Sequence, residues 1–457
     1  MSTAGKREFR PKIHFTPVRN WNNDPNGLVC VNGVWHLYYQ HYPNGTYWGP
    51  MHWGHASSTD LLHWTHLPVA LYPDELGMIF SGSMAYDREN TSGFGDGTRI
   101  PMVAVYTIHN KETDKEEQGI AYSLDGGLHF EKHYGNPVIA NPGIVNFRDP
   151  KVFRNEKKQC WSMILAAEDR AFLYASEDLK SWRKTGEFGK EENQVDAVWE
   201  CTDLFPVVPE GEEEEKWVLL ASMTASGPQG KPGMQYFVGD FDGETFRAQR
   251  QEETLWMDFG FDCYAGVTWG NCDRPVFIAW GVNPEYAAAV PTGEYSGMMT
   301  LPRELSLVRT PQGYRLRQRL VGIDHLRACS WEAASGDLLL TESFGLQISG
   351  TQGEVRLENE SGQRLRILVE KEWITVDRTE AGEKGFSDRF SRDIMCRART
   401  RRLAEGDVAA ELLFDVSYLE VFADRGLETA SLGVYPDSPY KTLYLEGDLR
   451  ARMYRLQ

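Results

Sequence analysis

The sequence lacks any closely spaced pair of cysteines. Its seven cysteines lie far apart, at positions 30, 160, 201, 263, 272, 329 and 396. Disulfide-rich scaffolds and structural zinc sites both need closer or more regular cysteine spacing than this. We therefore expect reduced thiols and a cytoplasmic protein.

Long apolar runs and an excess of basic residues are also missing. No stretch approaches the 18 or so apolar residues that span a membrane. The first 12 residues are polar and basic, without the apolar segment of a secretory signal peptide, which again favours the cytoplasm. Lysine and arginine number 48 against 66 aspartates and glutamates, a net charge of −18. Such a surface repels phosphate backbones and anionic lipids, so we expect neither nucleic acid nor membrane partners.

Helical periodicity is nearly absent as well. From about residue 10 to 305, short alternating segments such as 34–39 and 102–106 are separated by Gly, Pro, Asn and Asp clusters. This pattern predicts an all-β structure. A chain of 457 residues is too long for one ordinary core, so we expect two domains. The 14 tryptophans favour stacking on ring-shaped ligands such as sugars.

A repeat runs through this first region. A Ser or Asp, then an Asp-centred turn, then a closing aromatic residue recur in the segments 58–64, 123–130, 176–182 and 240–246. The closing aromatics, Trp64, Phe130, Trp182 and Phe246, lie 66, 52 and 64 residues apart. Units of this length with about four short strands are typical of propeller blades. With the strands of residues 263–300, which lack the turn, the pattern predicts five blades.

The composition of the sequence changes after residue 305. Residues 312–327 are polar and rich in arginine, and we expect a short linking helix there. Further on, strands separated by turns every 8 to 12 residues predict a β-sandwich. The predicted organisation is a five-bladed β-propeller over 1–310, a linker over 311–328 and a β-sandwich over 329–457. We expect a packing role for the sandwich and consider it a candidate surface for a homo-oligomer.

The most informative stretch is 20–27, in which Asp24 lies on an Asn-Asp-Pro-Asn-Gly turn that Pro25 makes rigid. A solvated hairpin would explain this motif alone. In a propeller, however, the first strand of every blade lines one channel. Asp149, just before the strand at 151–153, and Glu200, beside a tryptophan, can therefore meet Asp24.

Two carboxyls in different environments are what a glycosidase needs. A polar turn favours the ionised form of one, and an aromatic neighbour favours the protonated form of the other. They can then serve as nucleophile and general acid. Spacing alone leaves rival carboxylates open, namely Glu168, Asp169, Asp203 and Asp262.

Several motifs, in order along the chain, resemble glycoside hydrolase family 32, which contains invertases, inulinases and levanases. They are the segments 23–27, 48–56, 80–83, 148–150, 200–201, 258–262, 264–265, 300–305 and 419–422. The resemblance covers nearly the whole chain. It implies a five-bladed propeller followed by a sandwich, and retaining hydrolysis of β-fructofuranosides without a metal or other cofactor.

The resemblance also implies roles for individual residues. Asp24 corresponds to the nucleophile, Glu200 to the general acid and base, and Asp149 to the stabiliser of the transition state. The positions that match the family's fructose pocket are Asn23, Gln40, Trp48, Phe80, Ser81, Arg148, Asp262, Tyr264 and Trp280. For each aromatic residue in this set, a place in the hydrophobic core is the alternative.

Two positions depart from the family pattern. Asn22 stands where Met or Leu is usual, and Thr202 stands where Pro commonly follows Glu-Cys. Neither change removes a catalytic group, but both can alter the pocket beyond the fructosyl unit.

We therefore expect a cytoplasmic β-fructofuranosidase whose partner is a small carbohydrate, either sucrose or a short fructo-oligosaccharide. Four alternatives stay open: a sucrose-6-phosphate hydrolase, a fructosyltransferase, a fructan-binding propeller without activity, and an inverting hydrolase of the arabinan type.

Overall fold

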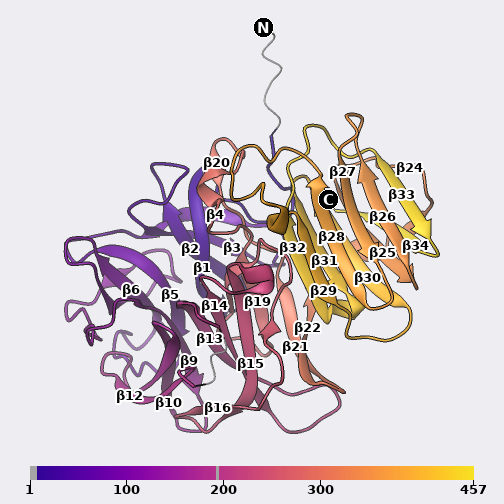
Figure 1. Cartoon of the computed structure of the whole chain (residues 1–457). Helices are drawn as coiled ribbons and strands as arrows, with labels where there is room; N and C mark the ends of the chain where they lie inside the picture. The colour runs from indigo at the N-terminus through magenta and orange to yellow at the C-terminus, as the bar shows by residue number, and fades with distance from the viewer. Residues whose placement is uncertain (1–7, 192–194, 457) are drawn as a thin grey trace.

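The computed structural model describes residues 8–191 and 195–456, and they form two β-rich domains side by side (Figure 1). Seven sheets account for both domains. The predicted all-β class, the five-bladed propeller and the C-terminal sandwich are confirmed. No helix within these described residues is long and apolar enough to cross a membrane.

Five sheets form the propeller. Blade I contains β1 (Asn20–Val31), β2 (Val34–Tyr42), β3 (His52–Ser58), β4 (Thr65–Leu71) and β20 (Tyr295–Ser296). Blade II contains β5 (Met78–Tyr86), β6 (Met102–Asn110), β7 (Lys115–Ser123) and β8 (Glu131–Lys132). Blade III contains β9 (Phe147–Asn155), β10 (Cys160–Ala167), β11 (Arg170–Ser176) and β12 (Arg183–Phe188). Blade IV contains β13 (Trp199–Val207), β14 (Lys216–Met223), β15 (Gly233–Phe241), β16 (Phe246–Ala248) and β17 (Leu255–Trp256). Blade V contains β18 (Tyr264–Thr268), β19 (Val276–Trp280), β21 (Arg303–Thr310) and β22 (Gly313–Leu320).

The inner strands β1, β5, β9, β13 and β18 contact one another in ring order, and β1 also contacts β18. The ring is closed by β20, which comes after β19 of blade V in sequence but pairs in parallel with β1. The first strand of each blade therefore lines the centre, as predicted from the sequence.

The sequence repeat marks the same place in four blades, the turn between the third and fourth strands. In each turn the side chain of one aspartate accepts two backbone N–H groups that lie within the next four residues; these are Asp60, Asp125, Asp178 and Asp242. An aspartate that bonds its own downstream backbone stabilises a turn without needing glycine at every position. The repeat is therefore a structural device, as predicted.

The linking helix predicted over 312–327 is wrong. Most of this segment is β22, the outer strand of blade V, which pairs along its full length with β21. The arginines at 315, 317 and 319 alternate with buried side chains, a period of two that belongs to a strand. Only α1 (Asp324–Arg327) is helical. The propeller thus extends to residue 320, and the boundary predicted at 310 falls between two paired strands.

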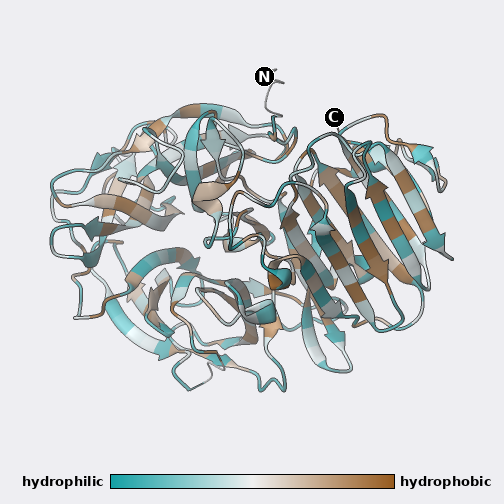
Figure 2. Cartoon of the chain, turned by 45° about the horizontal axis from the view of Figure 1, so that its top comes forward, coloured by the Kyte–Doolittle hydropathy of each residue, from teal (hydrophilic) through white to brown (hydrophobic). Residues whose placement is uncertain are grey.

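Two six-stranded sheets form the sandwich. The first contains β23 (Trp331–Ala333), β34 (Arg450–Arg455), β25 (Ser343–Gly350), β30 (Val408–Asp415), β31 (Tyr418–Ala423) and β32 (Glu428–Gly433). The second contains β24 (Asp337–Leu338), β33 (Thr442–Gly447), β26 (Gly353–Glu358), β27 (Arg364–Val369), β28 (Trp373–Glu380) and β29 (Arg397–Arg401). Hydrophobic and hydrophilic residues alternate along many of these strands, as expected where one face of a sheet is buried (Figure 2). Short 3-10 turns are η1 (Pro228–Gly230), η2 (Ala287–Ala289), η3 (Asp393–Met395) and η4 (Asp424–Gly426).

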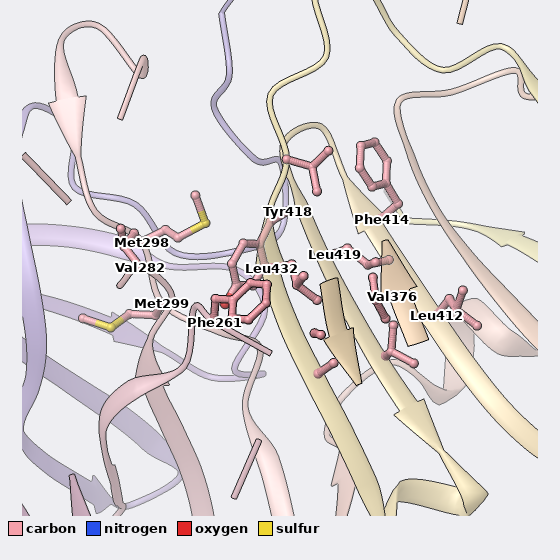
Figure 3. Close-up of a cluster of buried hydrophobic side chains, with 14 of the residues drawn as sticks. Phe261, Val282, Met298, Met299, Val376, Leu412, Phe414, Tyr418, Leu419 and Leu432 are labelled. Atoms are coloured by element: carbon pink, nitrogen blue, oxygen red, sulfur yellow. The ribbon is translucent and has the colours of Figure 1, made fainter. Parts of the chain in front are cut away.

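The two domains share one hydrophobic core. Phe261 and Met298 of the propeller belong to the same buried cluster as Tyr418 and Leu432 of the sandwich (Figure 3). Buried polar contacts cross the same interface: the Arg378 guanidinium lies 3.0 Å from Asp262. Both apolar and ionic contacts between the domains are removed from water. The sandwich is therefore packed firmly against the propeller and is not a loosely tethered domain.

The buried pair across this interface yields a stability prediction. Replacing Arg378 by Met leaves the Asp262 carboxylate buried without its cation, and we expect a loss of about 3–5 kcal/mol in the free energy of unfolding. Arg19, whose pair with Glu294 is solvent-exposed, provides the control. An Arg19→Met variant should leave the midpoint of chemical denaturation nearly unchanged. Equal midpoints for the two variants would contradict a stabilising role for the buried pair.

Candidate active site

Every blade contributes a polar side chain to one site in the channel. These side chains are Asp24 from β1, Ser81 from β5, Asp149 from β9, Glu200 from β13 and Tyr264 from β18. Hydrogen bonds and a shared thiol connect them directly. Residues far apart in sequence therefore meet because each lies at an equivalent place on an inner strand.

The inner strands share a local irregularity at this place. Relative to its neighbour, each carries an extra residue: in β1 after Asn22, in β5 after Ile79, in β9 after Arg148, in β13 after Glu200 and in β18 after Tyr264; β1 has a second one after Asn26. Three residues in these bulges, Asp149, Cys201 and Ala265, have positive φ values of 65°, 44° and 54°. A bulge bends the strand and re-aims its side chains, so the functional groups point into the channel instead of into the blade. Each such backbone strain costs about 1–3 kcal/mol and needs the surrounding fold to hold it.

The Asp24 carboxylate is held by two neighbouring donors. The Ser81 hydroxyl donates to Oδ2 at 2.6 Å, and the Asn23 amide donates to Oδ1 at 3.0 Å. Burial raises the pKa of Asp24 above its ordinary value, while the bonds from Ser81 and Asn23 counteract that rise. These bonds favour the ionised form, which is the form that can attack an electrophilic carbon.

The thiol of Cys201 lies between the carboxylates of Asp149 and Asp24. The Cys201 N–H donates to Asp149 Oδ2 at 2.9 Å, and Cys201 Sγ lies 3.6 Å from that oxygen and 3.5 Å from Asp24 Oδ2. Burial raises the pKa of Asp149; Arg148 opposes the rise, and the charges of Asp24 and Glu200 add to it. Cys201 was not among the predicted site residues. The Glu-Cys motif that contains it could have indicated its place in the site.

Glu200 is partly accessible, with a side chain 24% exposed. Arg148 Nη2 donates to its Oε1 at 2.9 Å, and the Tyr264 hydroxyl donates to its Oε2 at 2.6 Å. Both oxygens thus have a fixed partner, while an edge of the group remains open to a ligand. This arrangement suits a group that exchanges a proton with a bound molecule.

Two aromatic side chains, Trp48 and Phe80, lie near the carboxyls, since Phe80 directly precedes Ser81 on β5. Trp48 is half-exposed, and its ring lies edge-on to Phe80 at a centroid distance of 6.0 Å. Gln40 lies buried behind them and donates to the Ile79 carbonyl. Exposed aromatic faces beside a polar pocket are suited to sugar rings, which have apolar faces and polar edges. Within the described residues, no group of three or more His, Cys, Asp or Glu side chains is arranged to hold a metal.

Family models match both domains. The model described as "Glycosyl hydrolases family 32 N-terminal domain" matches residues 14–319, and "Glycosyl hydrolases family 32 C terminal" matches residues 321–449. The chain belongs to glycoside hydrolase family 32. It is therefore a glycoside hydrolase of the β-fructosidase family, as the motifs predicted.

Individual relatives agree with this assignment. The levanase of Bacillus subtilis (strain 168) is 39% identical over 464 residues, which cover 96% of this chain and 68% of that protein. The extracellular exo-inulinase of Aspergillus awamori is 32% identical over 511 residues, covering 98% of this chain and 94% of that protein. Because some relatives are named as extracellular, the cytoplasmic location stays a prediction.

Solved structures share the whole architecture. The exo-inulinase from Aspergillus awamori superposes with a TM-score of 0.90 at 30% identity, covering 99% of both chains. A β-fructofuranosidase from Schwanniomyces occidentalis complexed with fructosyl-erythritol has a TM-score of 0.86 at 27% identity, covering 98% of this chain and 97% of that one.

Two residues predicted to line the pocket of this family 32 enzyme lie elsewhere. Asp262 is buried at the domain interface, where its carboxylate accepts from Arg378, Tyr286 and the backbone of Asn283 and Gly433. That prediction was wrong because the motif around Asp262 does not reveal its partner in the sandwich. Trp280 is 4% exposed and packs edge-on against Trp21 in the core. For this aromatic residue the core alternative is correct.

The rival carboxylates have structural partners. Asp203 is fully buried and pairs with the Lys151 ammonium at 3.1 Å. Glu168 accepts from the backbone of residues 145 and 146 and so holds a loop. Asp169 accepts from the neighbouring Arg170. None of these four contacts reaches the group formed by Asp24, Asp149 and Glu200.

The two departures from the family pattern are both buried polar side chains without a hydrogen-bond partner among the described residues. The Asn22 amide has neither its nitrogen nor its oxygen bonded, and the Thr202 hydroxyl is likewise unbonded. A methyl group on Gly297 would clash with the Asn22 amide oxygen, so this side chain is tightly enclosed. An apolar residue of similar volume avoids the cost of burying an unbonded amide.

This enclosure yields a second stability prediction. We expect Asn22→Leu to raise the free energy of unfolding by about 1 kcal/mol, because it removes an unbonded buried amide. The matched control is Asn26→Leu on the same strand. The Asn26 amide is also buried but donates to the Asp24 carbonyl and accepts from the Gly82 N–H. That variant should be destabilised, and thermal unfolding of the pair checks both signs.

The bonds to Asp24 also yield a pH prediction. We predict that activity requires ionised Asp24 and is lost as pH falls through the pKa of this carboxyl, which burial raises and Ser81 lowers. Ser81→Ala removes a hydrogen bond to a charged group, so the acidic limb of the kcat/KM profile should move up by about one pH unit. Ser83→Ala is the control, since the Ser83 hydroxyl donates to the Pro150 carbonyl and not to a carboxylate. An unmoved limb in Ser81→Ala would exclude this coupling.

Proposed function

We propose that the chain is a retaining β-fructofuranosidase. It removes terminal β-D-fructofuranosyl units from sucrose or short fructo-oligosaccharides through a covalent fructosyl-enzyme intermediate. The observation that carries the proposal is the division of labour between two carboxyls. Both side chains are partly exposed: Asp24 is held by donors that favour the anion, and Glu200, from another blade, is bonded on both oxygens.

In the first step, an Asp24 oxygen attacks the anomeric C2 of the fructosyl unit. The bond from C2 to the glycosidic oxygen breaks, and its electron pair stays on that oxygen, which takes a proton from Glu200. A positioned general acid is typically worth about 10²- to 10⁴-fold in rate. Asp149 binds fructose hydroxyls and stabilises the positive charge that develops on the ring.

In the second step, water replaces the leaving group. Glu200, now ionised, takes a proton from water as the water oxygen bonds to C2, and the bond from C2 to Asp24 breaks. Both carboxyls then regain their starting states. Two displacements at C2 retain the anomeric configuration.

We place the leaving group beside the aromatic pair of Trp48 and Phe80. Relatives named levanase and exo-inulinase support a fructan as one source of the fructosyl unit, and invertase 1 of Saccharomyces cerevisiae, 38% identical over 379 residues, supports sucrose. These 379 residues cover 78% of this chain and 70% of that protein. Short substrates fit our expectation of a cytoplasmic enzyme.

The test is a comparison of kcat/KM for sucrose, sucrose 6-phosphate, 1-kestose and inulin on purified protein and on Asp24→Asn. We expect turnover of sucrose and 1-kestose, release of the β-anomer of fructose first, and a loss of at least about 10⁴-fold in Asp24→Asn, as for removal of a covalent nucleophile. Glu294→Gln, an exposed carboxylate in a surface ion pair, provides the control and should keep full activity.

Other outcomes identify the alternatives. A clear preference for sucrose 6-phosphate would assign the phosphorylated sugar as substrate. Trisaccharide formation above fructose release at high sucrose would indicate a transferase, and first release of the inverted anomer would overturn the retaining mechanism. Binding of these sugars without any turnover would leave only a fructan-binding protein.

A further inference from the structure

Glu116, which lies outside every motif found in the sequence, sits directly behind the active site. It belongs to β7 of blade II and is buried. Its carboxylate accepts the Phe147 N–H at 2.8 Å and Arg148 Nη1 at 3.0 Å on each oxygen. These contacts therefore tie blade II to the inner strand of blade III at the two residues before Asp149.

Arg148 is shared between Glu116 and the site. Its Nη1 is bound by Glu116 and by the Asn146 amide oxygen at 2.8 Å, while its Nη2 donates to Glu200 Oε1 at 2.9 Å. Its Nε lies 4.0 Å from Asp149 Oδ2. A guanidinium is a rigid planar fork, so immobilising one nitrogen fixes the directions of the other two.

We propose that Glu116 is a positioning residue for catalysis: it anchors Arg148 so that one N–H is aimed at Glu200, and its negative charge offsets the cation in front of the general acid. This inference rests on the function proposed above, in which Glu200 must carry a proton in the first step. Without Glu116, Arg148 would lose the carboxylate that binds its Nη1, and its uncompensated charge would favour ionised Glu200.

The charge balance at this place supports the assignment. Burial acts to raise the pKa of Glu116, but His109, Arg148 and the Phe147 N–H together hold the pKa below its usual value, so Glu116 stays ionised throughout the working range. His109 Nδ1 lies 3.6 Å from Glu116 Oε1, and the His109 ring stacks on Phe80.

Several charged or titratable groups face Glu200 from the elements around it. They are Arg148 and Asp149 from β9, Tyr264 from β18, Asp24 from β1 and the adjoining Cys201. Of these, only Arg148 carries a positive charge. The net charge that Glu200 experiences from this side therefore depends on whether Arg148 is compensated by Glu116.

The experiment compares Glu116→Gln with the parent protein on two substrates. Sucrose has a poor leaving group that needs the proton from Glu200, whereas 4-nitrophenyl β-D-fructofuranoside has a leaving group that departs without one. The quantity compared is kcat/KM, because it reports the steps up to the first bond cleavage. We expect a loss of about 10- to 100-fold on sucrose, a part of the value of a general acid, and less than about threefold on the nitrophenyl substrate.

The pH profile gives a second readout. The alkaline limb of kcat/KM for sucrose reports loss of the proton from the general acid. In Glu116→Gln this limb should move to lower pH by about half a unit to one unit, because the Arg148 charge is no longer offset. Glu116→Asp keeps the negative charge, but its side chain is one methylene shorter. The alkaline limb of this variant should therefore stay close to that of the parent, while its kcat/KM on sucrose falls.

The matched control is Glu117→Gln, the next residue on β7. Glu117 loses the same charge but is only partly buried, and it accepts from the Asn141 N–H instead of Arg148. Both kinetic readouts should stay at the parent values in this variant. In a His109→Gln variant, the alkaline limb of kcat/KM should stay at the pH of the parent. That result would exclude titration of His109 as the origin of the limb.

The outcomes separate the two proposals. Equal losses on both substrates in Glu116→Gln, or an unmoved alkaline limb, would overturn the positioning role and leave Glu116 a structural residue. If Glu116→Gln fails to fold, Glu116→Asp decides by the same ratio between the two substrates. A parent protein inactive on both substrates would instead contradict the proposed function.

Discussion

The interactions of Arg148 are the constraint on which the acidic centre depends. Three carboxyls and a thiol lie close together in the channel, and like charges so placed resist ionisation. The guanidinium contacts Glu200 directly, lies near Asp149 and is itself held by Glu116. One partly buried cation thus holds the neighbouring carboxyls in fixed positions. The function proposed above needs carboxyls that ionise differently, because one group must attack as an anion while another delivers a proton.

The propeller makes this arrangement possible through the bulges of its inner strands. A regular strand would alternate its side chains between the two faces of a blade, so that none of them would point along the channel. At least one extra residue in each inner strand breaks this alternation at the depth of the site. The backbone strain at Asp149 and Cys201 is retained because several hydrogen bonds determine their positions. Thr107 accepts the Asp149 N–H, and Asp149 in turn accepts the Cys201 N–H.

The sandwich supports the site indirectly. Arg378 and Arg303, both buried, bind aspartates of the segment that leads into β18, the strand that carries Tyr264. Arg303 also binds Glu420 of the sandwich. Since Tyr264 donates to Glu200, the geometry of Glu200 is connected through blade V to the domain interface. The sandwich therefore has a packing role with a consequence for the site.

The sequence by itself determined the all-β class, the blade repeat and the three carboxyls of the centre, because alternation, Asp-centred turns and short motifs are local properties. Only the tertiary structure decided the partners of each group. Asp262 was expected in the pocket but is bound by an arginine 116 residues away. Glu116 carried no motif, and its importance comes from a contact between two blades. Residues 313–320 were expected in a helix, but pairing with β21 makes them a strand. Sequence spacing records only the order of residues along the chain. The ionisation of a buried group is governed by its neighbours in space, and in a propeller those neighbours come from other blades.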